Sequence, residues 1–244
     1  MQDRNAEVFF ERDGESLRGF VAVPERDGPL PGLVLIPDVR GLYEHYRDVA
    51  RRFAAGGYVT LAVDLYSREG TPELADLASV FEWMRSLPDG RILADLHAAG
   101  DYLSSRADVC DGAIGITGFC MGGQYALMAA SSGARFAACV GWYGMLRYTE
   151  RLPNRPRSPL DLAAGLACPY LGLFGEDDEL IPAADIDELS SRLTHAGKDF
   201  EIVTYPGAGH AFMNNTRPDA FRADAAEDSF ARALAFFDRH LRAT

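Results

Sequence analysis

Residues 118–123 read GFCMGG, and the short apolar run AIGIT stands directly before them. The residues that follow, QYALMAA, are helix formers. A strand, a nucleophile flanked by glycines and a helix make up the nucleophile elbow, a sharp turn that exposes a reactive side chain at a strand end. Serine commonly occupies the tip of this turn, whereas this sequence has Cys120 there.

The elbow pattern also predicts where the sulfur atom of Cys120 points. The turn holds its nucleophile in a strained conformation and tolerates only small neighbours, which Gly118 and Gly122 supply. The sulfur should project into a crevice near the backbone N–H of Met121 and the positive end of the following helix. That environment favours the thiolate, which is the nucleophilic form of cysteine.

Elsewhere in the chain, strand-like and helix-like segments alternate, which is typical of βαβ units and a mostly parallel sheet. Asp13 and Gly14 are turn residues between two alternating segments, so residues 7–25 predict an N-terminal β-hairpin. We expect an α/β fold with helices on both faces of the sheet. Further strands are expected at 29–38, 58–66, 113–119, 136–144, 169–178 and 199–206, and helices at 46–57, within 71–105, and at 121–133, 182–197 and 219–241.

Length, composition and charge narrow the class of protein. The chain has 244 residues, of which 48% are hydrophobic, so residues 1–244 can form one domain with a sizeable core. A net charge of -12 argues against binding to nucleic acid or to an anionic membrane surface. The charged start lacks the apolar stretch of a signal peptide, so we expect a cytoplasmic protein. It would be a monomer or a small homo-oligomer.

The four cysteines do not indicate a metal site. No two of them form a CxxC pair, and their spacings fit no zinc module. Cys139 and Cys168 stand in apolar, strand-like runs, where buried packing is the better interpretation. Only Cys120 has a sequence context that calls for a chemical role.

Two further polar residues follow predicted strands, at the edge where open α/β sheets place their active sites. Asp178 ends the stretch LGLFGEDD, and His210 stands in YPGAGHAF. With Cys120 they give the chain order nucleophile, acid, histidine. His210 would act as the base toward Cys120, and Asp178 would orient the imidazole. Asp177 is an alternative for the acid, because the pattern alone does not separate neighbouring carboxylates.

These stretches resemble the dienelactone hydrolase family of α/β-hydrolases over nearly the whole chain. GFCMGG is similar to the family's G-[FY]-C-x-G-G, YPGAGHAF to its Y-x-x-x-x-H-x-F, and GEDDELIP to its G-x-x-D-x-x-[VI]-P. The last match assigns the acid to Asp178. The resemblance implies cleavage of an ester or lactone through an acyl-cysteine, without metal or cofactor. It also implies an oxyanion hole formed by the backbone N–H groups of Met121 and Val39.

The sequence departs from the family pattern at two places. Where the family has a glutamate that helps to activate the cysteine, this chain has Asp38, which is one methylene shorter. Where members that act on dienelactone have an arginine shortly after the histidine, it has Asn214 and Asn215. Arg40, or an arginine in RYTERLPNRPRSP, could bind a substrate carboxylate instead. The rings expected near the substrate pocket are Phe119, Tyr143 and Phe212.

Three functions are therefore consistent with the sequence. The first is a dienelactone hydrolase-like enzyme for a small ester or lactone. The second is a broad-specificity carboxylesterase or lactonase for neutral substrates, which Asn214 and Asn215 favour. The third is a non-catalytic protein that binds ligands or senses thiol chemistry on the same scaffold, for which Asp38 leaves room.

Overall fold

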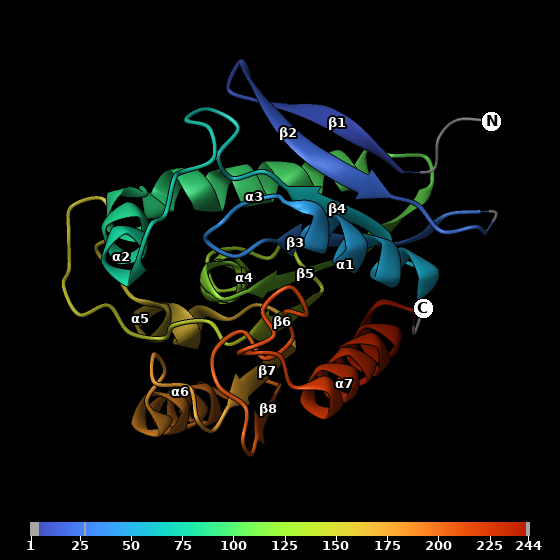
Figure 1. The fold of residues 1–244 in the computed structure, drawn as a ribbon. Coiled ribbons are helices and arrows are strands. Elements are labelled where there is room, and N and C mark those ends of the chain that lie inside the picture. The colour runs from blue at the N-terminus through green and yellow to red at the C-terminus, as the bar shows by residue number, and fades with distance from the viewer. Residues whose placement is uncertain (1–4, 27, 243–244) are drawn as a thin grey trace.

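The computed structural model describes residues 5–26 and 28–242. Within these ranges, eight strands form one sheet in the order β1-β2-β4-β3-β5-β6-β7-β8, shown in Figure 1. Strands β3 to β8 run parallel to one another, while β1 pairs with β2, and β2 with β4, in antiparallel fashion. The strands are β1 (Asn5–Arg12), β2 (Glu15–Ala22), β3 (Leu30–Ile36), β4 (Val59–Val63), β5 (Val109–Phe119), β6 (Ala138–Trp142), β7 (Tyr170–Gly175) and β8 (Phe200–Tyr205).

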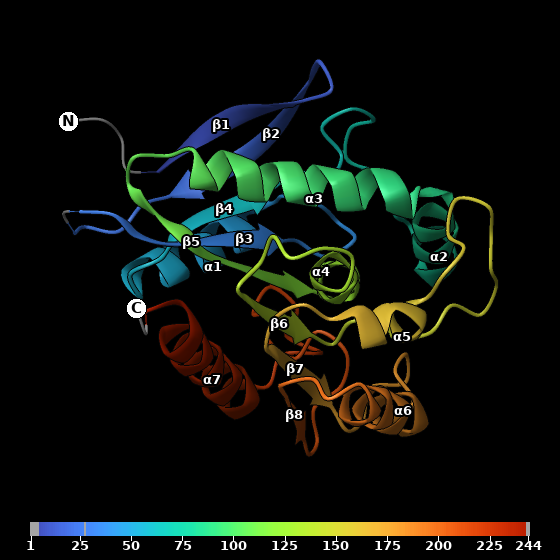
Figure 2. The same cartoon turned by 180° about the vertical axis from the view of Figure 1, so that it is seen from behind.

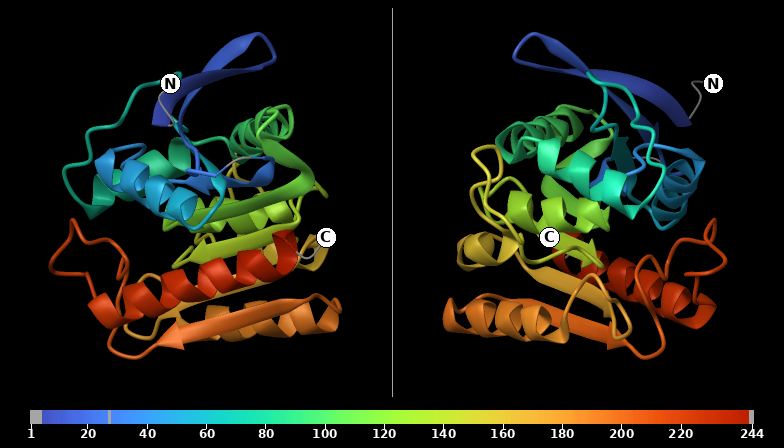
Figure 3. Two further views of the ribbon diagram at one scale, coloured as in Figure 1. Left: turned by 90° about the vertical axis from the view of Figure 1, so that its right-hand side faces the viewer. Right: turned by 60° about the vertical axis from the view of Figure 1, so that its left-hand side comes forward.

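Helices cover both faces of this sheet, as Figures 2 and 3 show. α1 and α7 lie on one face, and α3, α4 and α6 lie on the other. The helices are α1 (Glu44–Ala55), α2 (Leu77–Ser86), α3 (Asp89–Ser104), α4 (Met121–Ala130), α5 (Pro159–Leu162), α6 (Ala183–His195) and α7 (Ala223–Leu241), with a 3₁₀ turn η1 (Ala163–Gly165). The predicted α/β architecture is confirmed.

The predicted N-terminal hairpin is also confirmed. Asp13 and Gly14 both have positive φ, at 53° and 80°, which is the backbone of the tight turn that suits a twisted hairpin. β2 then pairs in antiparallel fashion with β4 and joins the hairpin to the parallel sheet. The hairpin therefore extends the sheet away from the strands that carry the candidate site.

Aromatic side chains join α1 and α7 beneath the sheet. Phe53 of α1 packs against Phe230 and Phe237 of α7, with ring centroids 4.7 and 6.2 Å apart. It also contacts the edge of Trp142 at the end of β6. All four side chains are buried. Burial of such rings supplies a large share of the hydrophobic free energy of folding, so this cluster ties the two helices to the sheet.

The structure corrects one expectation about a helix boundary. Residues 71–105 were expected to be mostly helical from Pro72, but α2 begins only at Leu77. Asp76 caps this helix, because its side chain accepts a hydrogen bond from the N–H of Ser79 at 2.8 Å. Residues 71–76 therefore form an extended stretch, which leads directly over the candidate site. The break expected at 88–90 lies slightly earlier, at Leu87 and Pro88, because α3 already begins at Asp89.

The extent of the domain stays a prediction, since residues 1–4, 27 and 243–244 lie outside the described part of the chain. Within the described part, every helix is too short or too polar to cross a membrane.

Candidate active site

Cys120 stands at the junction of β5 and α4, in the predicted sharp turn. Its backbone has φ 56° and ψ −118°, a conformation that L-residues rarely adopt. A Cβ atom on Gly118 would lie 2.1 Å from the carbonyl oxygen of Gly122, and one on Gly122 would lie 2.2 Å from the carbonyl oxygen of Ile36. Only glycine fits at these two positions. The close approach explains why the elbow needs glycine on both sides of the cysteine.

Backbone hydrogen bonds hold the elbow in place. The N–H of Cys120 donates to the carbonyl oxygen of Trp142 at 3.0 Å, and its own carbonyl oxygen accepts from Gln124 at 3.1 Å. Met121 is the first residue of α4, so its N–H has no partner within the helix. This N–H lies at the positive end of the helix dipole, where an anion is stabilised.

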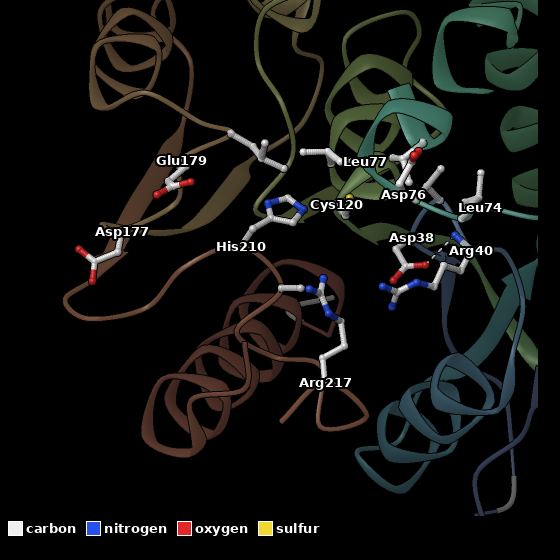
Figure 4. Close-up of a pocket in the computed structure, with 15 residues that line it drawn as sticks. Asp38, Arg40, Leu74, Asp76, Leu77, Cys120, Asp177, Glu179, His210 and Arg217 are labelled. Carbon is white, nitrogen blue, oxygen red and sulfur yellow. Dashed lines mark hydrogen bonds between the residues drawn. The ribbon is translucent and has the colours of Figure 1, made fainter. Parts of the chain in front are cut away.

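Asp178 and His210 meet at the ends of neighbouring strands. Asp178 follows β7 and His210 follows β8, and the Nδ1 atom of His210 lies 2.8 Å from the Oδ2 atom of Asp178. The Asp178 side chain is fully buried and also accepts a hydrogen bond from the N–H of Leu180. Asp177 is exposed, and Figure 4 shows its carboxylate directed away from the imidazole. Of the two neighbouring carboxylates, Asp178 is therefore the one in contact with His210.

The other ring nitrogen of His210 faces the nucleophile. Its Nε2 atom is buried and has no hydrogen-bond partner in the described part of the chain, and Figure 4 shows the ring directed toward Cys120. Burial lowers the pKa of His210, but the charges of Cys120 and Asp178 and the hydrogen bond to Asp178 outweigh it and raise that pKa to about 10. An imidazole held in this way can exchange protons with the sulfur and with a bound substrate.

The aromatic residues expected at the pocket lie behind His210. Tyr143 packs edge-on against the imidazole of His210, with ring centroids 5.3 Å apart, and against Phe212, with ring centroids 5.2 Å apart. Phe119 stacks on Trp142, with ring centroids 4.4 Å apart. The rings of Phe119, Tyr143 and Phe212 are buried and do not line the cavity described below. Of the three rings, Tyr143 is the one that packs against the imidazole. Tyr143 has a positive φ of 38°, a strained conformation of the kind that clusters at functional sites.

A cavity of about 550 Å³ opens over Cys120 and His210. One wall is apolar and comes from the extended stretch before α2 and from α2 itself. On another side, Arg40 and Arg217 direct their guanidinium groups into the cavity, as Figure 4 shows. Asp38 and Val39 also line it. The apolar wall consists of Leu74, Ala75, Leu77 and Val80.

Sequence reasoning missed Arg217 and the apolar wall. Arg217 stands seven residues after His210, in a loop whose path the sequence pattern does not predict. Its only described ion pair is an exposed one, with Asp219 at 3.3 Å. The arginines of the loop 147–158 do not line the cavity. Three of them instead pair with carboxylates elsewhere: Arg147 with Asp185 and Glu188, Arg151 with Asp161, and Arg155 with Asp89.

Asp38 lies in the same cavity as Cys120, and its carboxylate has two described hydrogen-bond partners. Oδ1 accepts from the N–H of Arg40 at 2.9 Å, and Oδ2 accepts from the hydroxyl of Tyr43 at 3.3 Å. The Tyr43 hydroxyl accepts in turn from the amide of Asn214 at 2.8 Å. This chain of hydrogen bonds ties the loop after β3 to the loop after His210.

The two asparagines after His210 therefore have structural partners. Asn214 is buried, and its side-chain oxygen accepts from both the N–H and the hydroxyl of Thr216. Asn215 bonds to Nδ1 of the buried His45 at 3.1 Å. Neither asparagine lines the cavity. Their hydrogen bonds connect the loop after His210 to Tyr43 and His45.

The described ranges contain no group of three or more His, Cys, Asp or Glu side chains that could hold a metal ion. The chemistry available at this site comes from a thiol, an imidazole, carboxylates, backbone N–H groups and guanidinium groups.

Comparison with known proteins gives consistent matches. Residues 17–241 match the dienelactone hydrolase family. A protein of Escherichia coli strain K12 named "Putative carboxymethylenebutenolidase" is 37% identical over 93% of this chain and 84% of its own length. A protein of a Bradyrhizobium species named "Probable 2-oxo-3-(5-oxofuran-2-ylidene)propanoate lactonase" is 37% identical over 94% of this chain and 92% of its own length.

A solved structure agrees with these matches. The crystal structure titled as a "Putative Dienelactone Hydrolase" from Klebsiella pneumoniae superposes with a TM-score of 0.91 at 35% identity, over 96% of this chain and 98% of that one. The α/β-hydrolase fold expected from the sequence is confirmed.

Proposed function

The chain belongs to the dienelactone hydrolase family, and from that premise we propose that it cleaves a small, anionic ester or lactone through an acyl-cysteine intermediate. The observation that carries the proposal is the hydrogen bond from His210 to the buried Asp178, with the free Nε2 atom of the same ring turned toward Cys120. A binding or thiol-sensing protein has no need of a carboxylate that orients the histidine.

Acylation begins when the thiolate sulfur of Cys120 attacks the substrate carbonyl carbon and forms a C–S bond. The carbonyl π electrons move to oxygen, and the backbone N–H groups of Met121 and Val39 stabilise the resulting oxyanion. When the tetrahedral intermediate collapses, the C–O bond to the leaving group breaks. The leaving oxygen takes a proton from Nε2 of His210. In a lactone this hydroxyl stays attached to the acyl group.

Deacylation uses the same groups in reverse. A water molecule gives a proton to Nε2 of His210 and attacks the thioester carbon. The C–S bond then breaks, which releases the carboxylic acid product and restores the thiolate of Cys120. Asp178 keeps Nδ1 of the ring occupied throughout, so that Nε2 always faces the reaction.

Asp38 is the candidate for activating the nucleophile. It is a buried carboxylate in the same cavity as Cys120, where it can take up the thiol proton and pass it to His210 before substrate is attacked. The Arg40 N–H and the Tyr43 hydroxyl hold its two oxygens in place. Aspartate thus replaces the family's glutamate with its orientation fixed by neighbouring donors.

Two guanidinium groups on one side of the cavity favour a substrate that carries a carboxylate, while Asp38, Asp76, Asp177 and Glu179 also line the cavity. Arg40 and Arg217 bring two guanidinium groups to one side, and guanidinium groups bind carboxylates with well-defined geometry. The asparagines that favoured a neutral substrate are engaged elsewhere. A lactone that carries a carboxylate also matches the propanoate lactone in the name of the Bradyrhizobium relative.

The test is a substrate screen with variants. Wild type should hydrolyse carboxylate-bearing lactones, and Cys120→Ala should reduce that turnover to the background rate. Arg217→Gln should raise KM for an anionic lactone about tenfold and leave a neutral ester of the same size unaffected. Arg151→Gln is the matched control, because Arg151 lies outside the cavity. Equal turnover by wild type and Cys120→Ala would contradict the proposal.

A further inference from the structure

Tyr66 contacts both residues that we assign to the oxyanion hole. It follows the end of β4 and is 1% exposed. Its hydroxyl donates to the carbonyl oxygen of Val39 at 2.9 Å and lies 3.7 Å from the Sδ atom of Met121. A single phenol therefore joins the loop after β3 to the first residue of α4, two segments more than 80 residues apart in the chain.

The contact with Val39 fixes a turn whose geometry decides where the Val39 N–H points. The peptide between Val39 and Arg40 is held at both ends, since Tyr66 binds its carbonyl oxygen and Asp38 binds its N–H at 2.9 Å. The N–H of Gly41 closes the turn by donating to the carbonyl oxygen of Asp38 at 3.0 Å. Among the described residues, the N–H of Val39 itself has no hydrogen-bond partner, so it is available to a ligand.

The ring of Tyr66 is itself held firmly. Trp83 of α2 packs edge-on against it with centroids 5.5 Å apart. On another side the chain approaches so closely that a Cβ atom on Gly41 would lie 2.9 Å from the ring. The hydroxyl is therefore presented to Val39 and Met121 from a fixed position, as preorganised catalysis requires.

We propose that Tyr66 is a positioning residue that sets the relative placement of the two oxyanion donors, the N–H groups of Val39 and Met121. This inference rests on the proposed function, because it concerns the same reaction. Tyr66 does not line the cavity, so it touches neither substrate nor leaving group. Its effect should therefore be on the transition state, where negative charge develops on the carbonyl oxygen, and not on ground-state binding.

The test compares two tyrosines at opposite ends of β4. Tyr66→Phe removes only the hydroxyl and should lower kcat about tenfold with little change in KM, less than the 10²–10³-fold cost of losing a donor outright. Tyr58→Phe is the control. Tyr58 is equally buried and its hydroxyl bonds to Asp238, but it lies at the strand end far from Cys120. Its kcat should equal that of wild type.

A second measurement separates positioning from general damage. Alkylation of Cys120 by iodoacetamide forms no oxyanion, so its rate should be the same in Tyr66→Phe and wild type. If ester turnover and alkylation fall together, or if kcat does not change, the proposal is overturned. If Tyr66→Phe does not fold, Met121→Leu removes only the sulfur contact and should lower kcat severalfold, and an unchanged kcat would refute the proposal. Failure of the proposed function would show differently, as equal turnover by wild type and Cys120→Ala.

Discussion

At the scale of single residues, burial distinguishes two neighbouring carboxylates that a sequence pattern leaves almost equivalent. Asp178 is buried against the imidazole of His210, whereas Asp177 is exposed. The family resemblance assigns the acid to Asp178, and the contact of Asp178 with His210 supports that proposal. Only a carboxylate shielded from water can hold the ring nitrogen strongly and stabilise its charged form.

This difference predicts unequal effects of two conservative substitutions. Asp178→Asn should lower kcat/KM at least about 100-fold, because the neutral amide no longer selects the reactive tautomer of His210. Asp177→Asn should leave kcat/KM within a factor of about two, since its carboxylate is solvated. Steady-state kinetics on a carboxylate-bearing lactone would check both values. Similar losses in the two variants would argue against the assigned acid.

The raised pKa of His210 predicts a pH dependence. Because the folded-state pKa of about 10 lies above the ordinary value of 6.5, protonation of His210 stabilises the fold fully below pH 6.5. That stabilisation is lost as the pH rises through about 10. The charge of Cys120 is the largest of the effects that raise this pKa, so Cys120→Ala should lower the pKa of His210. Titration of the imidazole signals by NMR would measure the shift, and an unchanged pKa in the variant would contradict it.

At the scale of secondary-structure elements, close backbone packing constrains the β5–α4 junction more than helix propensity does. α4 begins with two glycines after Met121, which propensity alone disfavours. A side chain on Gly122 would collide with backbone oxygens of residues 36 and 37 at the end of β3. The glycines allow α4 to pack against the strand ends, and this packing brings Cys120 beside Val39.

Two glycines at helix starts should therefore respond in opposite ways to alanine. Gly122→Ala should destabilise the protein by about 3 kcal/mol, because its Cβ would lie 2.2 Å from a backbone oxygen that cannot move aside cheaply. Gly90→Ala in the first turn of α3 meets no atom within 4 Å and should be neutral or stabilise by up to about 1 kcal/mol. Urea denaturation of both variants would measure these changes. Equal destabilisation would show that loss of glycine flexibility, and not contact, is responsible.

At the scale of the whole molecule, the sheet and its two helical layers bring segments that are far apart in the sequence together at a single site. The strand order places β3, β5, β7 and β8 so that the loops after them meet at one edge of the sheet. This edge carries Cys120, Asp178 and His210, as expected for an open parallel sheet. The aromatic cluster around Phe53 secures α1 and α7 on the face opposite α4.

Two phenylalanines should differ strongly in their contribution to global stability. Phe53→Ala should lower the free energy of unfolding by about 3–5 kcal/mol, since it empties the space between α1, α7 and β6. Phe9→Ala removes a ring that is 64% exposed on β1. This substitution should change the free energy of unfolding by less than about 0.5 kcal/mol. Denaturant unfolding of both variants would test the contrast. A small effect of Phe53→Ala would mean that the aromatic cluster is dispensable.

Local patterns were sufficient for the type and order of the long helices and the strands and for three candidate catalytic residues, but they did not predict α5 or η1. Apolar runs, turn residues and helix-start signals depend on neighbours close in sequence, so they can be read without knowing the fold. The elbow and the strand-end positions of Asp178 and His210 belong to this class. The late start of α2 was missed because Asp76 and Ser79 form a cap that competes with Pro72 as a start signal.

The sequence did not predict which residues line the substrate side of the cavity or which residues hold them in place. Both depend on tertiary structure. Arg217 reaches the cavity because its loop folds back over His210, and Asn214 and Asn215 turn away because Tyr43 and His45 bind them. Tyr66 meets Val39 and Met121 only once three strand ends have been brought together. Such contacts join residues far apart in the chain. No local pattern encodes them, because they exist only after the sheet has assembled and its loops have packed.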